Sequence, residues 1–155
     1  SRRSIEEIFL VARKWGIRIA VENLLPHLLG GDIGVLLALI AGFPRNTVGI
    51  CFDTSHAHLW SEFSVEQLLE RAGSHVVTLH LSDNAGRYDD HSAPGAGTID
   101  WEGVFRSLQR INYSGVAMLE VYTKNPSGDP GGELVSLHRQ IQSLVAQGAA
   151  GGRKQ

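Results

Sequence analysis

The stretch Val76-Val77-Thr78-Leu79-His80-Leu81-Ser82-Asp83-Asn84 decides how this sequence folds. Its first six residues are mainly apolar and β-branched and too few for a helix. They predict a buried strand that carries the imidazole of His80 near its end. A loop of about fifteen residues, 84–98, follows, as its turn-forming composition indicates. Loops of that length without periodicity are usually functional or disordered. This one contains an Asp-x-His pair, Asp89 and His91, which favours a functional loop.

The same pattern, a short apolar run followed by a metal-ligand type of side chain, occurs three more times. The runs are Ile17 to Val21 before Glu22, Val48 to Phe52 before Asp53, and Val116 to Leu119 before Glu120. The spacing between runs suits the roughly 30 or more residues of a strand-loop-helix unit, and no hairpin signal joins them, so the strands should be parallel. Parallel strands end at one edge of a sheet, where sites form in β/α folds. We therefore expect the four ligand-type side chains, that of His80 included, to meet at that edge.

Helical spacing of apolar residues, together with capping residues, predicts five helices. They span Ser4–Trp15, Asp32–Ala41, Ser64–Gly73, Asp100–Ile111 and about Glu133–Ala146. The order is one helix followed by four strand-helix repeats. If the sheet curves like a barrel wall, the helices cover only one face, and a complete eight-stranded barrel takes about 250 residues. The predicted fold is thus α/β, a parallel (β/α) barrel of TIM type, with residues 1–147 forming its second half (strands five to eight) and residues 148–155 a disordered tail.

Composition narrows the classes of partner. The chain has 155 residues, of which 14 are basic and 16 acidic, and its net charge is −2. The basic residues are scattered, which argues against nucleic acid and against an anionic membrane as partners. The only cysteine, Cys51, lies inside a predicted strand as a core residue, so no disulfide forms within the chain, as expected in a reducing compartment such as the cytoplasm. No signal peptide or long apolar span is evident, and a start on Ser and a helix hints at a missing upstream segment.

Five motifs, in this order along the chain, resemble the xylose isomerase-like barrel superfamily. They are Val21-Glu22-Asn23, Gly49 to Ala57 (GICFDTSHA), His80 to Asn84 (HLSDN), Asp89-Asp90-His91 with Pro94 to Trp101, and Leu119-Glu120. This superfamily includes sugar-phosphate isomerases and epimerases, and also the endonuclease IV type of apurinic-site nuclease (AP endonuclease family 2). The resemblance covers nearly the whole chain and corresponds to strands five to eight of the barrel.

In the epimerase branch, the resemblance implies one divalent metal ion held by four ligands. These ligands match Glu22, Asp53, His80 and Glu120, and their chemistry suits Mn²⁺, Mg²⁺ or Zn²⁺. Such an ion can stabilise the enediolate of a sugar, while Glu22 and Glu120 exchange a proton as base and acid. His56 matches a histidine that binds a substrate hydroxyl. Two further residues, Arg87 and Lys124, are candidates for contacts with an anionic group of the substrate.

In the nuclease branch, the same four ligands match a zinc cluster that also includes His56, Asp89 and His91. That cluster also needs histidines from the first half of the barrel, which this sequence does not contain. The acidic balance favours a small substrate over DNA. Three hypotheses therefore stand: a metal-dependent isomerase or epimerase of a sugar or sugar phosphate, a zinc-dependent apurinic-site endonuclease, and a half-barrel that is inactive or requires a partner, either a homo-oligomer or a missing N-terminal half.

Overall fold

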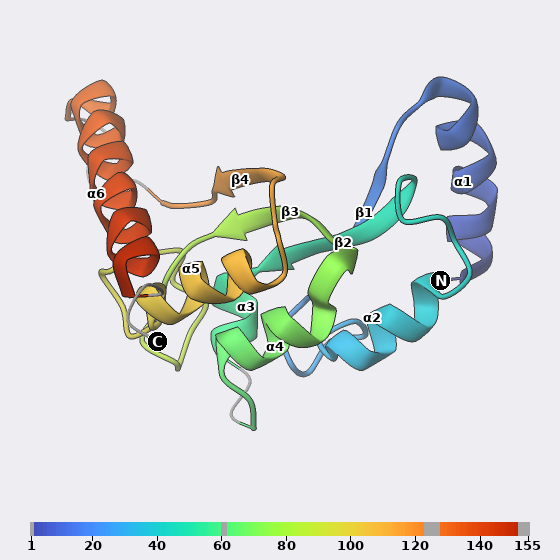
Figure 1. Cartoon of the computed structure of the whole chain (residues 1–155), viewed down its shortest axis with the longest axis horizontal. Coiled ribbons are helices and arrows are strands. Elements are labelled where there is room, and N and C mark those ends of the chain that lie inside the picture. The colour runs from blue at the N-terminus through green and yellow to red at the C-terminus, as the bar shows by residue number, and fades with distance from the viewer. Residues whose placement is uncertain (1, 60–61, 123–127, 152–155) are drawn as a thin grey trace.

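The computed structural model describes residues 2–59, 62–122 and 128–151, and in that part of the chain it contains a four-stranded parallel sheet (Figure 1). The strands are β1 (Ile19–Glu22), β2 (Val48–Asp53), β3 (Val76–Leu81) and β4 (Val116–Leu119). They pair in chain order, and all three pairs are parallel. Consecutive strands that lie side by side are what repeated β/α units produce. The predicted α/β fold with a parallel sheet is confirmed.

The helices lie mainly on one side of this sheet. They are α1 (Arg2–Trp15), α2 (Ile33–Ile40), α3 (Thr54–His58), α4 (Val65–Ala72), α5 (Trp101–Arg110) and α6 (Pro130–Gly151), with a 3₁₀ turn η1 (Gly73–His75) before β3. Helices α2, α4 and α5 lie in a row along one face of the sheet, whereas α1 and α6 stand at its two ends (Figure 1). The apolar faces of the row bury the core against the strands, as expected for helices of a barrel wall.

Alternation along β2 separates the core from the face that will carry the site. Ile50 and Phe52 are fully buried in the hydrophobic core beneath the helices. Because successive side chains of a strand point to opposite faces, Cys51 and Asp53 lie on the face that the helices leave uncovered. The pairing register places Asp53 beside His80 of β3. Strand β2 therefore places Asp53 on the side of the site and its large apolar side chains on the side of the core.

The uncovered face and the two edges of the sheet are consistent with half of a barrel. Val116 and Met118 of β4 are 66% and 53% exposed, and Met118 lies beside His80 in the register. Within the described residues, β1 pairs only with β2 and β4 pairs only with β3. Four of the eight strands of a TIM barrel are thus present, which is consistent with a half-barrel.

Several predicted boundaries were wrong. Residues 54–58 form the short helix α3 rather than a loop, because the Oδ1 atom of Asp53 caps it by accepting the backbone N–H of His56 at 2.7 Å. Helix α1 begins at Arg2 and not at Ser4. Helix α6 continues to Gly151, so residues 148–151 of the expected tail are helical, and residues 152–155 lie outside the described part. None of the helices described here is long and apolar enough to cross a membrane.

Candidate metal centre

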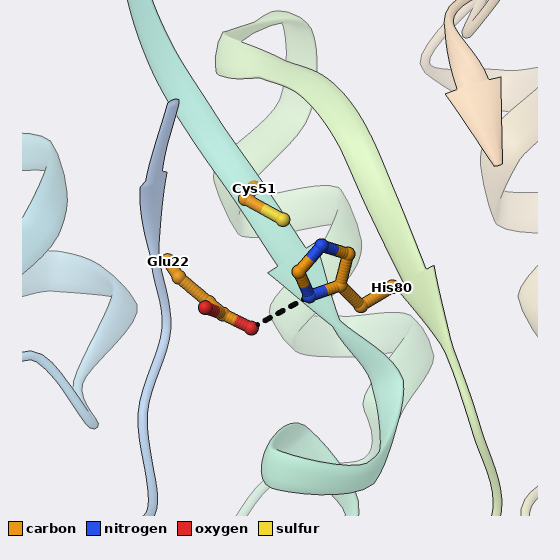
Figure 2. Close-up of side chains that lie close together, drawn as sticks. All are labelled: Glu22, Cys51 and His80. Carbon is orange, nitrogen blue, oxygen red and sulfur yellow. Dashed lines mark hydrogen bonds and ion pairs between the residues drawn. The ribbon is translucent and has the colours of Figure 1, made fainter. Parts of the chain in front are cut away.

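The site begins with two side chains that reach toward each other across β2. Glu22 is the last residue of β1, and its Oε1 atom lies 2.8 Å from Nδ1 of His80 on β3 (Figure 2). Cys51 lies beside Glu22 in the strand register, and its side chain points to the same face. Burial, together with the charges of nearby carboxylates, raises the pKa of the Cys51 thiol to about 12. The thiol is therefore neutral at ordinary pH.

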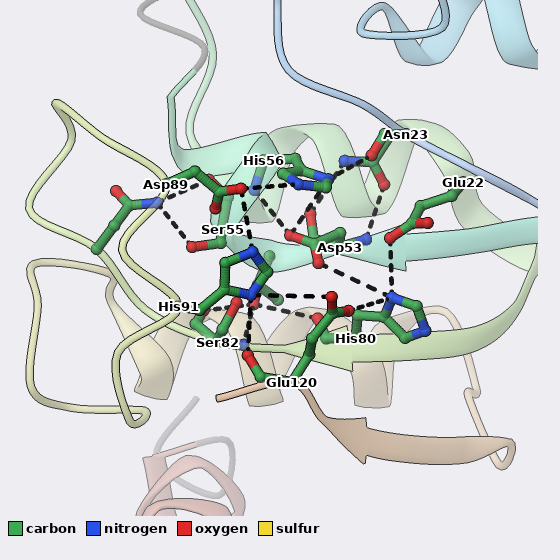
Figure 3. Close-up of polar contacts among 12 residues, drawn as sticks. Glu22, Asn23, Asp53, Ser55, His56, His80, Ser82, Asp89, His91 and Glu120 are labelled. Atoms are coloured by element: carbon green, nitrogen blue, oxygen red, sulfur yellow. Dashed lines mark hydrogen bonds and ion pairs between the residues drawn. The ribbon is translucent and has the colours of Figure 1, made fainter. Parts of the chain in front are cut away.

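Asp53 and Glu120 complete a group of four, which we call the tetrad (Figure 3). Each of its residues, Glu22, Asp53, His80 and Glu120, offers one ligand atom, and these atoms all lie within 4.8 Å of one another. The Nδ1 atom of His80 lies 2.7 Å from Oε2 of Glu120. The backbone N–H of Glu120 donates to the carbonyl of Leu81 at 3.1 Å, which fixes this glutamate at the sheet edge just beyond β4. The structure thus brings together all four side chains expected at that edge.

Asp53 is the least satisfied member of the tetrad. Its side chain has no exposed surface, and among the described residues its Oδ2 atom has no hydrogen-bond partner. The Nδ1 atom of His80 is 4.0 Å from this oxygen, beyond hydrogen-bond distance. Burial, and then the charges of Glu22 and Glu120, raise the pKa of Asp53 to about 6, against the opposing effect of the hydrogen bond from His56. A buried carboxylate oxygen without a partner requires an explanation, and a divalent cation within the tetrad would supply one.

A second group, His56, Asp89 and His91, lies beside the tetrad, and we call it the triad. The Oδ2 atom of Asp89 lies 3.2 Å from Nε2 of His56 and 3.1 Å from Nε2 of His91 (Figure 3). The other ring nitrogens face backbone carbonyls, Nδ1 of His56 that of Asn23 at 2.8 Å and Nδ1 of His91 that of Glu120 at 3.1 Å. Both imidazoles are therefore held at two points, with Asp89 between them.

The triad and the tetrad influence each other electrostatically. Burial of His56 disfavours its charged form, but the charge of Asp53, the carbonyl of Asn23 and the charge of Asp89 together raise its pKa above the usual value. The Nδ1 atom of His56 lies 3.7 Å from Oδ1 of Asp53. His56 thus links the buried carboxylate of the tetrad to the carboxylate of the triad.

Of the two predicted substrate contacts, Arg87 lies away from the tetrad, and Lys124 lies outside the described residues. Arg87 is exposed and lines a hollow of about 380 Å³ that also touches Leu25, His27 and Asp89. This hollow opens beside the triad, and not over the tetrad. Lys124 lies outside the described residues, so its predicted role stays a prediction.

Three buried polar residues received no role from the sequence. The side-chain amide of Asn23 holds the backbone of Asp53 on both sides, since its Nδ2 donates to the carbonyl at 3.0 Å and its Oδ1 accepts the N–H at 2.8 Å. Asp83 and Asn84 follow β3 and are fully buried. The available signal was position, since each of the three polar residues lies within three residues of the end of a strand.

Comparison with known proteins identifies the relatives of this arrangement. A family model described as xylose isomerase-like TIM barrel matches residues 1–142. The chain belongs to this family. Among xylose isomerase-like proteins, the uncharacterized protein MJ1311 of Methanocaldococcus jannaschii is 33% identical over 124 residues, which cover 76% of this chain and 41% of that protein. The inosose isomerase of Bacillus licheniformis is 26% identical over 125 residues, covering 76% of this chain and 45% of the isomerase.

Solved structures of the xylose isomerase-like fold agree with this assignment. The crystal structure of a D-tagatose 3-epimerase-like protein matches with a TM-score of 0.78 at 24% identity, covering 94% of this chain and 53% of that one. At this identity the likeness concerns the fold. The chain spans less than half the length of the two curated relatives and about half that of the solved structure. Named relatives and structural neighbours thus include sugar isomerases and epimerases.

Proposed function

We propose that this chain is the metal-binding half of an isomerase or epimerase that acts on a sugar or sugar phosphate. The observation that carries the proposal is the unpartnered Oδ2 atom of Asp53, buried among three other ligand-type groups. Three carboxylates and one imidazole suit a hard or borderline cation such as Mn²⁺, Mg²⁺ or Zn²⁺. The names of the relatives, an inosose isomerase and a D-tagatose 3-epimerase-like protein, support the same reaction class.

The chemistry follows from where the groups lie. A cation held by the tetrad would supply a Lewis acid for the carbonyl and neighbouring hydroxyl of a sugar. Glu22 and Glu120 come from the two outer strands and contact the same nitrogen of His80. Both glutamates are partly exposed, so they can reach a bound sugar, one removing a proton from carbon and the other returning one.

Residues around the tetrad would hold the sugar in place. His56 is 12% exposed on the side of the triad next to Asp53, and its Nε2 atom would bind a substrate hydroxyl in place of Asp89. Arg87, exposed at the neighbouring hollow, is the candidate for an anionic substituent, and Lys124 is a second candidate of the same kind. A sugar phosphate would use these cationic groups, and a neutral sugar would not.

Exchange of carbon-bound hydrogen with solvent deuterium tests the proposal directly. The full chain would be freed of metal, reloaded with Mn²⁺ and incubated with a panel of ketoses, aldoses and their phosphates in D₂O. We expect deuterium at the carbon next to the carbonyl of at least one sugar, and loss of this signal in Glu22→Gln and Glu120→Gln. Absence of both cation binding and exchange in the unsubstituted chain would overturn the proposal.

A second candidate function, a zinc-dependent apurinic-site endonuclease, is favoured by the triad alone. Its two imidazoles and one carboxylate form a ligand set typical of zinc, next to the tetrad. Metal content distinguishes the candidates, because one ion per chain favours the isomerase and two or more favour the hydrolase. The decisive assay is cleavage of a duplex with one abasic site by the zinc-loaded chain, with intact duplex as the control.

A third candidate is a half-barrel that needs a partner to work. A mainly apolar hollow of about 730 Å³ runs along β1 and touches the tetrad only at Glu22. On the opposite edge of the sheet, Val116 and Met118 expose further apolar surface. Size-exclusion chromatography with light scattering tests this candidate. A monodisperse monomer would overturn it, and a dimer or larger species would support it.

A further inference from the structure

Asp83 is a buried carboxylate whose four hydrogen bonds all serve the loop at residues 84–98 and its return. Its Oδ1 atom accepts the backbone N–H of Asn84 at 2.9 Å and that of Ile99 at 3.2 Å. Its Oδ2 atom accepts the N–H of Gly95 at 2.9 Å and the indole N–H of Trp101 at 2.8 Å. A carboxylate with four donors is fully satisfied. Asp83 therefore has no capacity left for a ligand. Its four hydrogen bonds all join parts of this one chain.

The backbone of Asp83 fixes the residue next to His91. Its N–H donates to the carbonyl of Ser92 at 2.8 Å, and its carbonyl accepts the N–H of Ser92 at 2.9 Å, forming an antiparallel bridge. His91 itself has a φ of +44°, in the left-handed region that is costly for a residue with a side chain. The bridge holds this conformation together with the backbone N–H of Tyr122, which donates to the carbonyl of His91 at 2.9 Å.

Asn84 connects the same loop to the other side of the triad. Its Nδ2 donates at 2.8 Å to both the carbonyl and the hydroxyl of Ser55, the residue before His56 in α3. Its Oδ1 accepts the N–H of Gly86, and its carbonyl accepts the N–H of Thr98 at 2.9 Å. Asp83 thus acts on the His91 side of the triad and Asn84 on the His56 side.

We propose that Asp83 and Asn84 are positioning residues that assemble the triad from a loop and a helix, which are also joined by the 2.8 Å hydrogen bond between Nε2 of His58 and Oγ1 of Thr98. Asp83 sets His91 and with it Asp89, while Asn84 sets the start of α3 and with it His56. The positioning claim stands on the geometry, and its metal readout rests on the second candidate function, in which the triad holds an ion of its own. It adds that Asp83 and Asn84, the second and third residues after β3, decide whether the triad can hold a cation.

The test compares Asp83→Asn with Asp90→Asn in the full chain. Asp90 lies on the same loop and is exposed, and its side chain makes no hydrogen bond or ion pair with the residues that the structure describes, so it is the control. The readouts are Zn²⁺ bound per chain, amide hydrogen exchange at residues 84–99, and the imidazole ¹⁵N shifts of His56 and His91. For D83N we expect the second equivalent of Zn²⁺ to bind about 10–100-fold more weakly, as when an outer-shell partner is lost, with faster exchange at Gly95 and Ile99 and shifted imidazoles. D90N should match the unsubstituted chain.

The outcomes separate the claim that the triad binds a metal ion from the claim that Asp83 and Asn84 position it. If the unsubstituted chain holds only one ion, the triad as a metal site fails, while hydrogen exchange and imidazole shifts still decide the positioning claim. Unchanged exchange and unchanged imidazoles in D83N would overturn it. If D83N unfolds as a whole, Trp101→Phe removes only one of the four donors and should give the same changes at smaller amplitude. A Trp101→Phe chain identical to the unsubstituted one would then overturn the inference.

Discussion

The tetrad and the triad share one edge of the sheet, yet they are built in different ways. The tetrad is placed by the strands, since each of its residues ends a strand, follows one or lies within one. The triad is placed by the short helix α3 and a loop, which Asp83 and Asn84 hold together. The tetrad gathers three carboxylates around one imidazole, whereas the triad sets one carboxylate between two imidazoles.

This difference predicts what each cluster requires. The triad also leaves one buried carboxylate oxygen without a hydrogen-bond partner among the described residues, Oδ1 of Asp89, but its single carboxylate faces two imidazoles. In the tetrad, negative charge exceeds what one imidazole can balance, and Asp53 retains an unpartnered buried oxygen. Like charges gathered in a buried position destabilise the folded state unless a cation compensates them. We therefore expect the tetrad to bind the first and tighter cation.

The largest expected effect comes from removing the charge of one carboxylate in each cluster. Asp53→Asn should weaken binding of Mn²⁺ or Zn²⁺ to the tetrad by more than about 100-fold, above the usual cost of losing an outer-shell partner. Asp89→Asn should change the affinity for the first ion by less than about 10-fold. Isothermal titration calorimetry on metal-free protein measures both. Equal losses of affinity in the two variants would mean that the clusters act as one site, and the distinction between tetrad and triad would be wrong.

Asp53→Asn, which should weaken metal binding, should stabilise the folded protein when no metal is bound. Because the folded-state pKa of Asp53, about 6, lies above the usual 3.8, its contribution to stability is greatest below about pH 3.8 and is lost as the pH rises through 6. At pH 8, Asp53→Asn should therefore raise the free energy of unfolding by roughly 3 kcal/mol, from 1.36 kcal/mol for each pKa unit. Urea unfolding in EDTA at pH 8 and pH 4 measures this.

An equal change at both pH values would show that the gain does not come from the buried charge. Glu120→Gln is the matched control, because this glutamate is 44% exposed and solvent screens its charge. We expect its metal-free stability to change far less. A gain in Glu120→Gln as large as that in Asp53→Asn would place the electrostatic cost on the whole cluster and not on the buried oxygen.

The two clusters also differ in how far the sequence foretold them. The tetrad followed from strand ends alone, because a parallel sheet brings these ends together whatever the loops do. The parallel sheet was predicted from the same strand pattern and the family from the resemblance of five motifs, and both are confirmed. The role of Asp83 was not predicted, because its partners Gly95, Ile99 and Trp101 lie up to 18 residues further along a loop without periodicity. Helix α3 was missed since Asp53, taken only as a ligand, also caps it.

A substitution in the loop should affect the triad more than the tetrad. In Gly97→Ala the new Cβ would lie 2.3 Å from the carbonyl oxygen of Asn84 and from Oδ1 of Asp83, so the loop must shift. We expect a loss of about 2 kcal/mol in stability, as for other overpacked sites, and weaker binding of the second ion. Gly131→Ala is the control, since its Cβ would be 3.4 Å from the nearest atom, Oδ1 of Asp129. Calorimetry and thermal unfolding measure both effects, and retention of the second ion in Gly97→Ala would count against the loop as the frame of the triad.

The smallest effect is expected at Cys51, which faces the tetrad without joining it. Its thiol lies within 4.8 Å of ligand atoms of Glu22 and His80, and is thus close enough to serve as a ligand. With a pKa of about 12 in the metal-free protein, the thiol must lose a proton at a free-energy cost before it binds a metal as a thiolate. Cys51→Ala should therefore change the affinities for Mn²⁺ and Zn²⁺ by less than about threefold, while Co²⁺ in the unsubstituted chain should show no sulfur-to-metal charge-transfer band. A strong band that disappears in Cys51→Ala, with a loss specific to Zn²⁺, would make Cys51 a ligand and give the tetrad a preference for softer metals.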